Sequence, residues 1–385
     1  MPTHKSSFIY LDHNATTPVD QAALKAMLPF IQNEFGNPSS PYSLGTRAGE
    51  ALEDSRQAVA RLLGCESNEI VFTSGGSESN NAVLKGIIDF KRPQDFHIII
   101  SAVEHPAILN PAIYLMEIGV EVTILDVDGF GRIAPDEVQR AVKPNTSLIS
   151  IMLANNETGT LQPIKEIAGI AKKYNIPLHT DAAQAVGKMH VDVNDLGVDF
   201  LSLAGHKLYG PKGVGVLFVK NGHHLTPIIH GAGQEGGKRA GTENIILAAG
   251  LGAACRVVKE RLDDDIRDMM MLRDRLQHLL FKGLDDLVLN GAPGIRLPNT
   301  LNVAVPGIEG SKILEGLPEL LASTGAACHD RSVRLSHVLS AMGVPLKIGM
   351  GTLRLTVGRT NTIRQVEKAA RMIVDRVKEM RKGVK

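Results

Sequence analysis

Residues 147–181 read SLISIMLANNETGTLQPIKEIAGIAKKYNIPLHTD and contain a strand, a helix and a second strand in succession. The run at 147–152 is largely apolar and the run at 176–181 begins apolar, a pattern typical of strands buried inside a sheet. Residues 163–175 between them have the length of a helix and open with proline, which is favoured at the first helical position. The stretch therefore predicts one strand–helix–strand unit of a parallel sheet.

The same alternation extends from about residue 68 to residue 220. Further β-rich runs lie at 69–73, 97–101, 121–126, 199–204 and 213–219. Helix-length segments separate several of them, as at 106–119 and 135–142. This repetition predicts an α/β fold in which helices sandwich a mostly parallel central sheet.

The composition changes after about residue 255. Two long charged segments, 256–284 and 363–383, have helical character, and the strand-like runs 301–305 and 352–357 lie between them. A smaller α+β domain explains this shift. We expect a large domain formed by residues 17–258 and a small domain formed by residues 1–16 and 259–385.

The overall composition excludes several classes of partner. The chain has 42 Lys and Arg against 41 Asp and Glu, so no strong field favours direct nucleic-acid binding or an anionic membrane. No apolar run is long enough to span a membrane and no signal peptide is visible, so we expect a cytoplasmic protein. Three widely spaced cysteines indicate neither a disulfide framework nor a metal site.

Polar residues follow the predicted strands, at the sheet edge where α/β proteins bind ligands. They are the loop 74–79 with Gly76 and Ser77, and the side chains of His105, Asn156, Asp181, Gln184, His206 and Lys207. Taken singly, each has a plainer interpretation: a strand-to-helix turn, a structural histidine or asparagine, or a lysine that begins a surface loop. Lys207 is the most informative, because an amine at the end of a buried strand is paired, neutralised or used covalently.

Together these residues predict one cofactor. A glycine loop suits a phosphate, a histidine can stack on an aromatic ring, an aspartate can pair with a ring nitrogen, and a lysine of lowered pKa can attack an aldehyde. Pyridoxal phosphate contains all four groups. Competing phosphate sites are excluded, because the chain has no GxxxxGK[ST] motif and residues 210–215 lack dinucleotide spacing.

Ten motifs in order make the sequence similar to one family from end to end. They are LDHNATTPVD, FGNPSS, FTSGGSESNN, EHPAIL, NNETG, HTDAAQAVGK, GHKLYGPKG, RAGTEN, STGAACH and LRLTVGRTNT. These motifs resemble the NifS/IscS-type cysteine desulfurases, which are class V aminotransferase-like, fold-type I pyridoxal-phosphate enzymes. The resemblance implies a homodimer that acts on L-cysteine.

The resemblance also implies a role for each matching residue. Lys207 would hold the cofactor covalently, Asp181 would pair with its ring nitrogen, and His105 would stack on its ring. Gln184 and Asn156 would contact its phenolic oxygen and the substrate. The other matches would bind phosphate (Gly76, Ser77, His206 and, from the second subunit, Thr242), hold the substrate carboxylate (Arg354) or orient the substrate (Asn37).

Cys328 matches the sulfur acceptor of the family, in a loop at about 323–336 of the small domain. The implied reaction converts L-cysteine to L-alanine and leaves a persulfide on Cys328 for delivery to a sulfur-acceptor protein of iron–sulfur cluster assembly or nucleic-acid thiolation. Two departures from the desulfurase pattern leave a selenocysteine lyase as an alternative. Ala204 stands where the desulfurases usually have serine, and the cysteine motif reads GAACH, which resembles the selenocysteine lyases. A class V aminotransferase is the third alternative.

Overall fold

A computed structural model describes residues 8–329 and 332–382, and the side chains of these residues except 326–329 and 332–334. Its centre is a seven-stranded sheet in the order β2-β8-β7-β6-β5-β3-β4. The strands are β2 (Ile70–Thr73), β3 (His97–Ser101), β4 (Glu121–Leu125), β5 (Thr146–Ser150), β6 (Leu178–Asp181), β7 (Phe200–Ala204) and β8 (Gly215–Val219). Six strands run parallel and β8 alone runs antiparallel to its neighbours β2 and β7. The predicted α/β fold with a mostly parallel sheet is confirmed.

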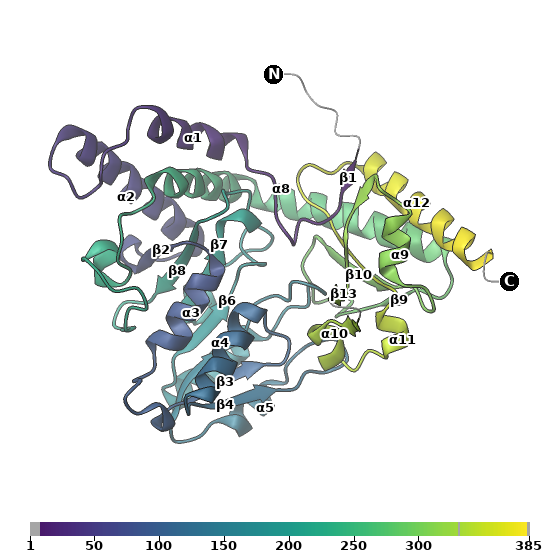
Figure 1. Ribbon diagram of the computed structural model, residues 1–385, viewed down its shortest axis with the longest axis horizontal. Coiled ribbons are helices and arrows are strands. Elements are labelled where there is room, and N and C mark those ends of the chain that lie inside the picture. Colours follow the sequence, from purple (N-terminus) through teal and green to yellow (C-terminus); the bar gives the residue numbers. More distant parts are fainter. Residues whose placement is uncertain (1–7, 330–331, 383–385) are drawn as a thin grey trace.

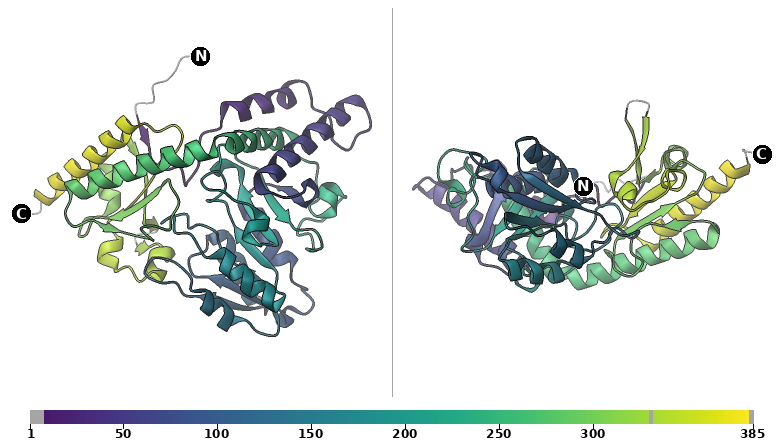
Figure 2. Two further views of the ribbon diagram at one scale, coloured as in Figure 1. Left: turned by 180° about the vertical axis from the view of Figure 1, so that it is seen from behind. Right: turned by 90° about the horizontal axis from the view of Figure 1, so that it is seen from below.

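Strand alternation separates the two faces of this sheet. In β3, Ile98 and Ile100 pack into one apolar cluster while Ile99 packs into another, because successive side chains point to opposite faces. The first cluster includes residues of α3 (Gly76–Gly86) and α4 (Pro106–Glu117). Figures 1 and 2 show these helices and the opposite layer from the two sides of the sheet.

Helices of the opposite layer bury the second face of the sheet. They are α2 (Ser43–Leu63), α5 (Pro135–Ala141), α6 (Ile164–Tyr174), α7 (Val193–Leu196) and the first part of α8 (Ile245–Gly283). The helix α1 (Gln21–Gln32) packs against α8. Amphipathic spacing explains the arrangement of α6, where Ile164, Ile167 and Ala171 share one buried stripe. The sheet is therefore sandwiched by helices, as the alternation of the sequence predicts.

A third apolar cluster surrounds a separate four-stranded antiparallel sheet of order β12-β15-β10-β9. Its strands are β9 (Val288–Leu289), β10 (Thr300–Ala304), β12 (Ser323–Thr324) and β15 (Thr352–Thr356). The end of α8 and the helix α12 (Ile363–Lys382) cover it. The first part of α8 packs into the cluster on the second face of the large sheet, and its end packs into this third cluster. One continuous helix therefore connects the two clusters (Figure 1).

Shorter elements complete the chain. The strand β1 (Ile9–Tyr10) pairs with β11 (Leu320–Leu321), and β13 (Ala326–His329) pairs with β14 (Ser332–Leu335) as an antiparallel hairpin. Three short helices are α9 (Gly310–Glu315), α10 (His337–Ala341) and α11 (Leu346–Gly349). The helix α9 contributes to the apolar cluster of the four-stranded sheet, whereas α10 packs against Val103 and Met152, which follow β3 and β5. The segment expected as a loop at 323–336 therefore consists of β12 followed by this hairpin.

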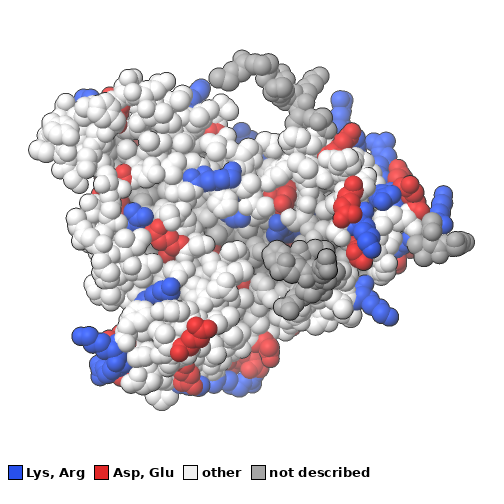
Figure 3. Space-filling view, in the orientation of Figure 1, with Lys and Arg blue, Asp and Glu red and all other residues white. Residues whose placement is uncertain are grey.

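Three further features of the chain are its charge distribution, the hydropathy of its helices and the grouping of its possible metal ligands. Acidic and basic side chains are interspersed over the face in Figure 3, in agreement with the balanced composition. Within residues 8–329 and 332–382, no helix is long and apolar enough to cross a membrane. In the same part of the chain, His, Cys, Asp and Glu form no group that could hold a metal ion.

Candidate functional site

A cavity of about 340 Å³ lies at the carboxyl ends of the parallel strands. Its size falls within the range of small-molecule sites, roughly 300–1,000 Å³. Segments that follow β2, β3, β5, β6 and β7 supply its wall, together with Arg354 of β15. It brings together the following predicted site residues: Gly76, Ser77, His105, Asn156, Asp181, Gln184, His206, Lys207 and Arg354.

The glycine loop forms one end of the cavity, where α3 begins at Gly76. The first N–H groups of a helix have no partner within the helix and carry a partial positive charge, so this end can bind an anion. The loop lies directly on the start of β8: a Cβ atom on Gly215 would come within 2.6 Å of the Gly75 backbone. Ala204, at the end of β7, also lines the cavity but has no hydroxyl to add a hydrogen bond.

Asp181 is held rigidly at the end of β6. Its Oδ2 accepts a hydrogen bond from Nδ2 of Asn80 at 2.7 Å, and its Oδ1 accepts one from the Ala183 N–H at 2.9 Å. The side chain is only 7% exposed. A fixed carboxylate in this position suits a partner that carries a proton on a ring nitrogen.

His105 is the N-cap residue of α4, which fixes its ring. The Ala107 N–H donates to its Nδ1 at 3.1 Å, so Nδ1 is an acceptor. Burial lowers the pKa of His105; Lys207 and His337 lower it further, whereas Asp181 opposes the shift. The ring is therefore neutral with its proton on Nε2, which suits stacking against an aromatic ring.

Lys207 lies just beyond β7, and two carbonyl oxygens hold its amine. Its Nζ donates to the backbone oxygens of Asn14 at 2.6 Å and Ala15 at 2.7 Å. Burial lowers the pKa of Lys207 to about 8, and the nearby Arg354 charge acts in the same direction. A much larger fraction of this amine is deprotonated near neutral pH than for an ordinary lysine, so it can act as a nucleophile.

His206 is neutral as well. Its Nδ1 lies 3.1 Å from Oγ1 of Thr16, and burial lowers the pKa of the ring to about 4 with a further contribution from Lys207. As a neutral ring, it can offer a hydrogen bond at the phosphate end but no charge.

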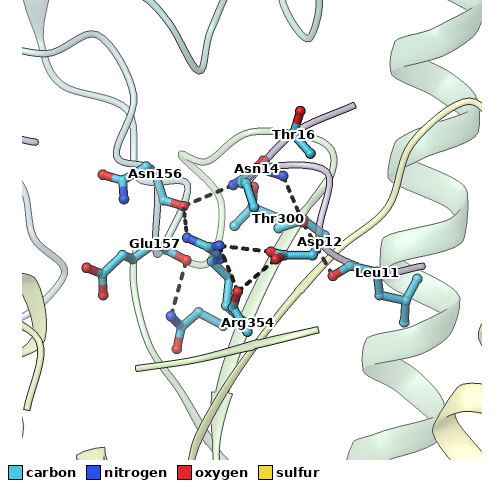
Figure 4. A network of polar contacts seen from close by, with 12 residues as sticks. Leu11, Asp12, Asn14, Thr16, Asn156, Glu157, Thr300 and Arg354 are labelled. Carbon is cyan, nitrogen blue, oxygen red and sulfur yellow. Dashed lines mark hydrogen bonds and ion pairs between the residues drawn. The ribbon is translucent and has the colours of Figure 1, made fainter. Parts of the chain in front are cut away.

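Arg354 lines the cavity and is the centre of a polar network (Figure 4). Its Nη2 donates to Oδ1 of Asp12 at 2.8 Å and to Oγ of Ser323 at 3.0 Å, and its Nη1 donates to the Asn156 carbonyl at 3.3 Å. Its Nε is buried without a partner among the described residues. The guanidinium therefore keeps donor capacity in a fixed orientation, as binding of a carboxylate requires.

Four residues that shape this site were missed by the sequence interpretation: Asp12, Asn80, Glu104 and Lys188. All four stand within motifs quoted above, but Asp12 and Asn80 make their contacts with segments far apart in the chain, and the burial of Lys188 depends on the fold. Glu104 is fully buried next to His105; its Oε1 accepts from Ser101 Oγ at 2.6 Å and from the Met152 N–H at 2.9 Å. It therefore ties the segments after β3 and β5 together.

Two predicted residues, Asn37 and Thr242, do not line the cavity of this chain. Asn37 and Thr242 are exposed, and the Asn37 side chain accepts the Ser39 N–H at 2.9 Å. Cys328 lies in β13 with its backbone opposite Val333, but its side chain is outside the described residues. Their roles remain predictions.

The residues present fit pyridoxal phosphate. Asn80 and Asn156 each keep a buried Oδ1 without a partner in the described part of the chain. The cavity also holds a helix N-terminus for a phosphate, a carboxylate for a ring nitrogen and an amine of lowered pKa for an aldehyde. Buried polar atoms without partners are rare in proteins, which indicates that a polar ligand completes this site.

Comparison with known proteins identifies the family. The family model of the class V aminotransferases matches residues 9–369. The chain belongs to this family. Class V aminotransferases depend on pyridoxal phosphate, so the predicted cofactor is confirmed.

Several cysteine desulfurases are among the relatives of this chain. The cysteine desulfurase IscS of Methanosarcina thermophila is 45% identical over 97% of this chain and 93% of its own length. A solved NifS-like protein superimposes with a TM-score of 0.90 at 35% identity and covers 96% of this chain and 99% of its own. A structure of SspA in complex with cysteine superimposes with a TM-score of 0.78 at 36% identity and covers 92% of this chain and 99% of its own. The predicted membership of the NifS/IscS-type group is confirmed.

Proposed function

We propose that this cysteine desulfurase converts L-cysteine to L-alanine and takes the sulfur on Cys328 as a persulfide. The observation that carries this proposal is the convergence of Lys207, Asp181, His105 and Arg354 on one cavity. Two of these groups suit an amino-acid substrate: Arg354 can bind its carboxylate, and Lys207 can accept or return a proton near its α-carbon. The solved relative with bound cysteine supports the same substrate class.

The geometry of the cavity supports a role for each residue that would hold pyridoxal phosphate. The start of α3 with Gly76 and Ser77 would bind the phosphate, Asp181 would keep the ring nitrogen protonated, and Lys207 would bind the aldehyde carbon. When bound, the cofactor withdraws electrons from the substrate, which weakens the bonds to be broken. Lys207 is held beside the Asn14 and Ala15 carbonyls, so once its amine is free it is placed to move protons.

Cys328 is the proposed sulfur acceptor. The two cysteines whose side chains are described, Cys65 and Cys255, are poor nucleophiles because burial raises the pKa of each thiol to about 12. In the proposed step the Cys328 thiolate attacks the substrate sulfur, and an S–S bond forms as the C–S bond breaks. The electron pair of the broken bond remains with the substrate carbon, which takes a proton to give alanine.

The assembly belongs to the same proposal. We infer a homodimer in which Thr242 of the second subunit completes the phosphate site; the exposure of Thr242 away from its own cavity supports this. Asn37 is proposed to orient the substrate. The persulfide would pass to a sulfur-acceptor protein of iron–sulfur cluster assembly or nucleic-acid thiolation in the cytoplasm.

One experiment tests the central step. Purified protein is given L-cysteine, alanine is quantified, and the mass of the peptide that contains Cys328 is measured. We expect alanine together with a Cys328 peptide heavier by one sulfur atom, no product from Cys328→Ala, and full activity in the control Cys65→Ala. Alanine formed by Cys328→Ala at the parent rate would contradict the persulfide step.

The same variants discriminate the alternatives. Ala204 and the GAACH motif favour a selenocysteine lyase as the second candidate. That activity predicts that Cys328→Ala still releases selenium from L-selenocysteine while it fails on L-cysteine. Turnover that requires a 2-oxo acid and is unaffected by Cys328→Ala would instead indicate an aminotransferase.

A further inference from the structure

Lys188 is a buried lysine without a carboxylate partner in the described part of the chain. It is 3% exposed and lies behind the cavity wall. Its Nζ donates to the side-chain Oε1 of Gln184 at 3.0 Å and to the Gln184 backbone oxygen at 3.1 Å. Burial lowers the pKa of Lys188 to about 7, with contributions from Lys207 and Arg354. Burying a lysine is costly, so its contact with Gln184 calls for an explanation.

The contact fixes the direction of the Gln184 amide. In its protonated form, below a pKa of about 7, Lys188 only donates hydrogen bonds, so it can meet the amide oxygen but not the amide NH2 group. The NH2 group therefore points the other way, where Nε2 donates to the Asn14 carbonyl at 3.0 Å. Its second hydrogen has no partner among the described residues, and Gln184 is one of the residues that line the cavity.

The hydrogen bonds of Gln184 also connect it to Lys207. The Asn14 carbonyl accepts from Gln184 Nε2 and also from Lys207 Nζ at 2.6 Å. A continuous series of hydrogen bonds therefore links Lys188, Gln184, Asn14 and Lys207. If the Gln184 amide were reversed, its NH2 group would face the ammonium of Lys188 and its oxygen would face the Asn14 carbonyl.

We propose that Lys188 is a positioning residue for the cofactor site, because it holds the Gln184 amide with its NH2 group toward the bound cofactor. The inference rests on the proposed function, since it takes Gln184 to face the cofactor. A donor aimed at an anionic ring oxygen stabilises the state that has lost a proton. Without Lys188, that donor is no longer fixed and a positive charge is lost as well, so the bound cofactor should hold its proton to higher pH.

The charges that act on this region lie on several elements. Lys207 and Arg354 repel the Lys188 ammonium, and Lys188 in turn lowers the pKa of His13 and His206. Lys212 also lowers the pKa of His206, but it is exposed. The variant Lys212→Met is therefore a matched control, because it removes one nearby positive charge and leaves the Gln184 amide in place.

The test is a pH titration of the visible absorbance of the holoenzyme. In Lys188→Met we expect the midpoint to rise by about one pH unit, a tenfold change in proton affinity. In Lys212→Met the midpoint should move much less. In protein freed of cofactor, the pH at which Lys207 reacts with an amine-modifying reagent should also rise in Lys188→Met. An unchanged midpoint in Lys188→Met would overturn the proposal.

Two further variants separate positioning from charge and from packing. In a Gln184→Met background, Lys188→Met should shift the midpoint no more than Lys212→Met does, because the amide is gone; an undiminished shift would overturn the positioning role. Lys188→Gln retains a donor, so it should shift the midpoint less than Lys188→Met, and an equal shift would contradict the proposal. Absence of the visible band from the parent protein would instead count against the proposed function.

Discussion

Arg354 at the cavity wall and Asp12 form an ion pair, with Nη2 and Oδ1 2.8 Å apart and both side chains less than one-fifth exposed. Ser323 joins the pair: its Oγ accepts from Arg354 at 3.0 Å and donates to Oδ2 of Asp12 at 2.8 Å. Ser323 opens β12, which leads into the hairpin of Cys328. The arginine proposed to bind the substrate is therefore connected to the segment proposed to receive its sulfur.

Asp12→Ala should weaken cysteine binding, because the Arg354 guanidinium loses the carboxylate that orients it. We expect the KM for L-cysteine to rise about tenfold, which corresponds to roughly 1.4 kcal/mol. Steady-state kinetics on the purified variant measure this. Asp263→Ala is the control, because Asp263 is 81% exposed and pairs with His190 at the surface. A KM that stays at the parent value in Asp12→Ala would show that Arg354 needs no such support.

Arg354→Lys should raise the KM for L-cysteine by at least tenfold, although the positive charge is kept. A lysine cannot form two parallel hydrogen bonds with a carboxylate, and it cannot contact Asp12, Ser323 and the Asn156 carbonyl together. The visible absorbance of the cofactor should remain, because Lys207 is untouched. Parent-like kinetics would remove Arg354 from its proposed role.

Attachment of the cofactor to cofactor-free protein should accelerate as the pH rises, reach half of its maximal rate near pH 8 and level off above about pH 9. The pKa of Lys207 is lowered to about 8, and only the deprotonated amine attacks an aldehyde. Stopped-flow absorbance measures the rate, and Lys207→Ala should give no visible band at any pH. A rate that still rises steeply above pH 9 would mean that the amine has an ordinary pKa.

Ala204→Ser should increase cofactor affinity two- to tenfold, because one added hydrogen bond contributes about 0.5–1.5 kcal/mol. Ala204 lines the cavity near Gly76, so a hydroxyl here has access to the phosphate end. Equilibrium titration of cofactor-free protein with pyridoxal phosphate measures the affinity. An unchanged dissociation constant would show that the missing hydroxyl is irrelevant.

Glu104→Gln should stabilise the protein at pH 8 but not at pH 5. Burial raises the pKa of Glu104 to about 8 in the folded chain, against an ordinary value of 4.5. Between these values the folded state binds one proton more than the unfolded state, so stability falls as pH rises, by up to about 1.4 kcal/mol per pH unit. Glutamine cannot ionise and avoids this loss. Urea unfolding at both pH values measures the difference, and an equal effect at the two would contradict a protonated Glu104.

Local patterns predicted the elements of the large sheet well. The runs at 147–152 and 176–181 became β5 and β6, and the segment 163–175 became α6. The segment 256–284 was predicted as a helix, yet α8 begins earlier, at Ile245. Most of residues 245–255 are buried, so this first part of the helix lacks the charged pattern by which the rest was predicted. The reversal of β8 has no local signal, since its apolar run suits either direction.

Site residues could be predicted from the sequence where the chemistry of one side chain is distinctive. They could not be predicted where their role depends on contacts that only the folded chain makes. Lys207 and Asp181 follow strands and are chemically distinctive, so their positions indicated a cofactor. Lys188 stands in a quoted motif four residues after Gln184, but only the fold shows that it is buried and bonded to that amide. Domain bounds and the roles of Asn37, Thr242 and Cys328 remain predictions.

The antiparallel β8 has a consequence for inheritance of the cofactor site. Because its first residue, Gly215, supports the Gly75 backbone, a side chain at 215 would displace the start of α3. The phosphate loop is thus constrained by a glycine about 140 positions later in the gene. Descendants of this chain should be free to vary at exposed positions of the following turn, yet a mutation at Gly215 should be purged through loss of cofactor retention.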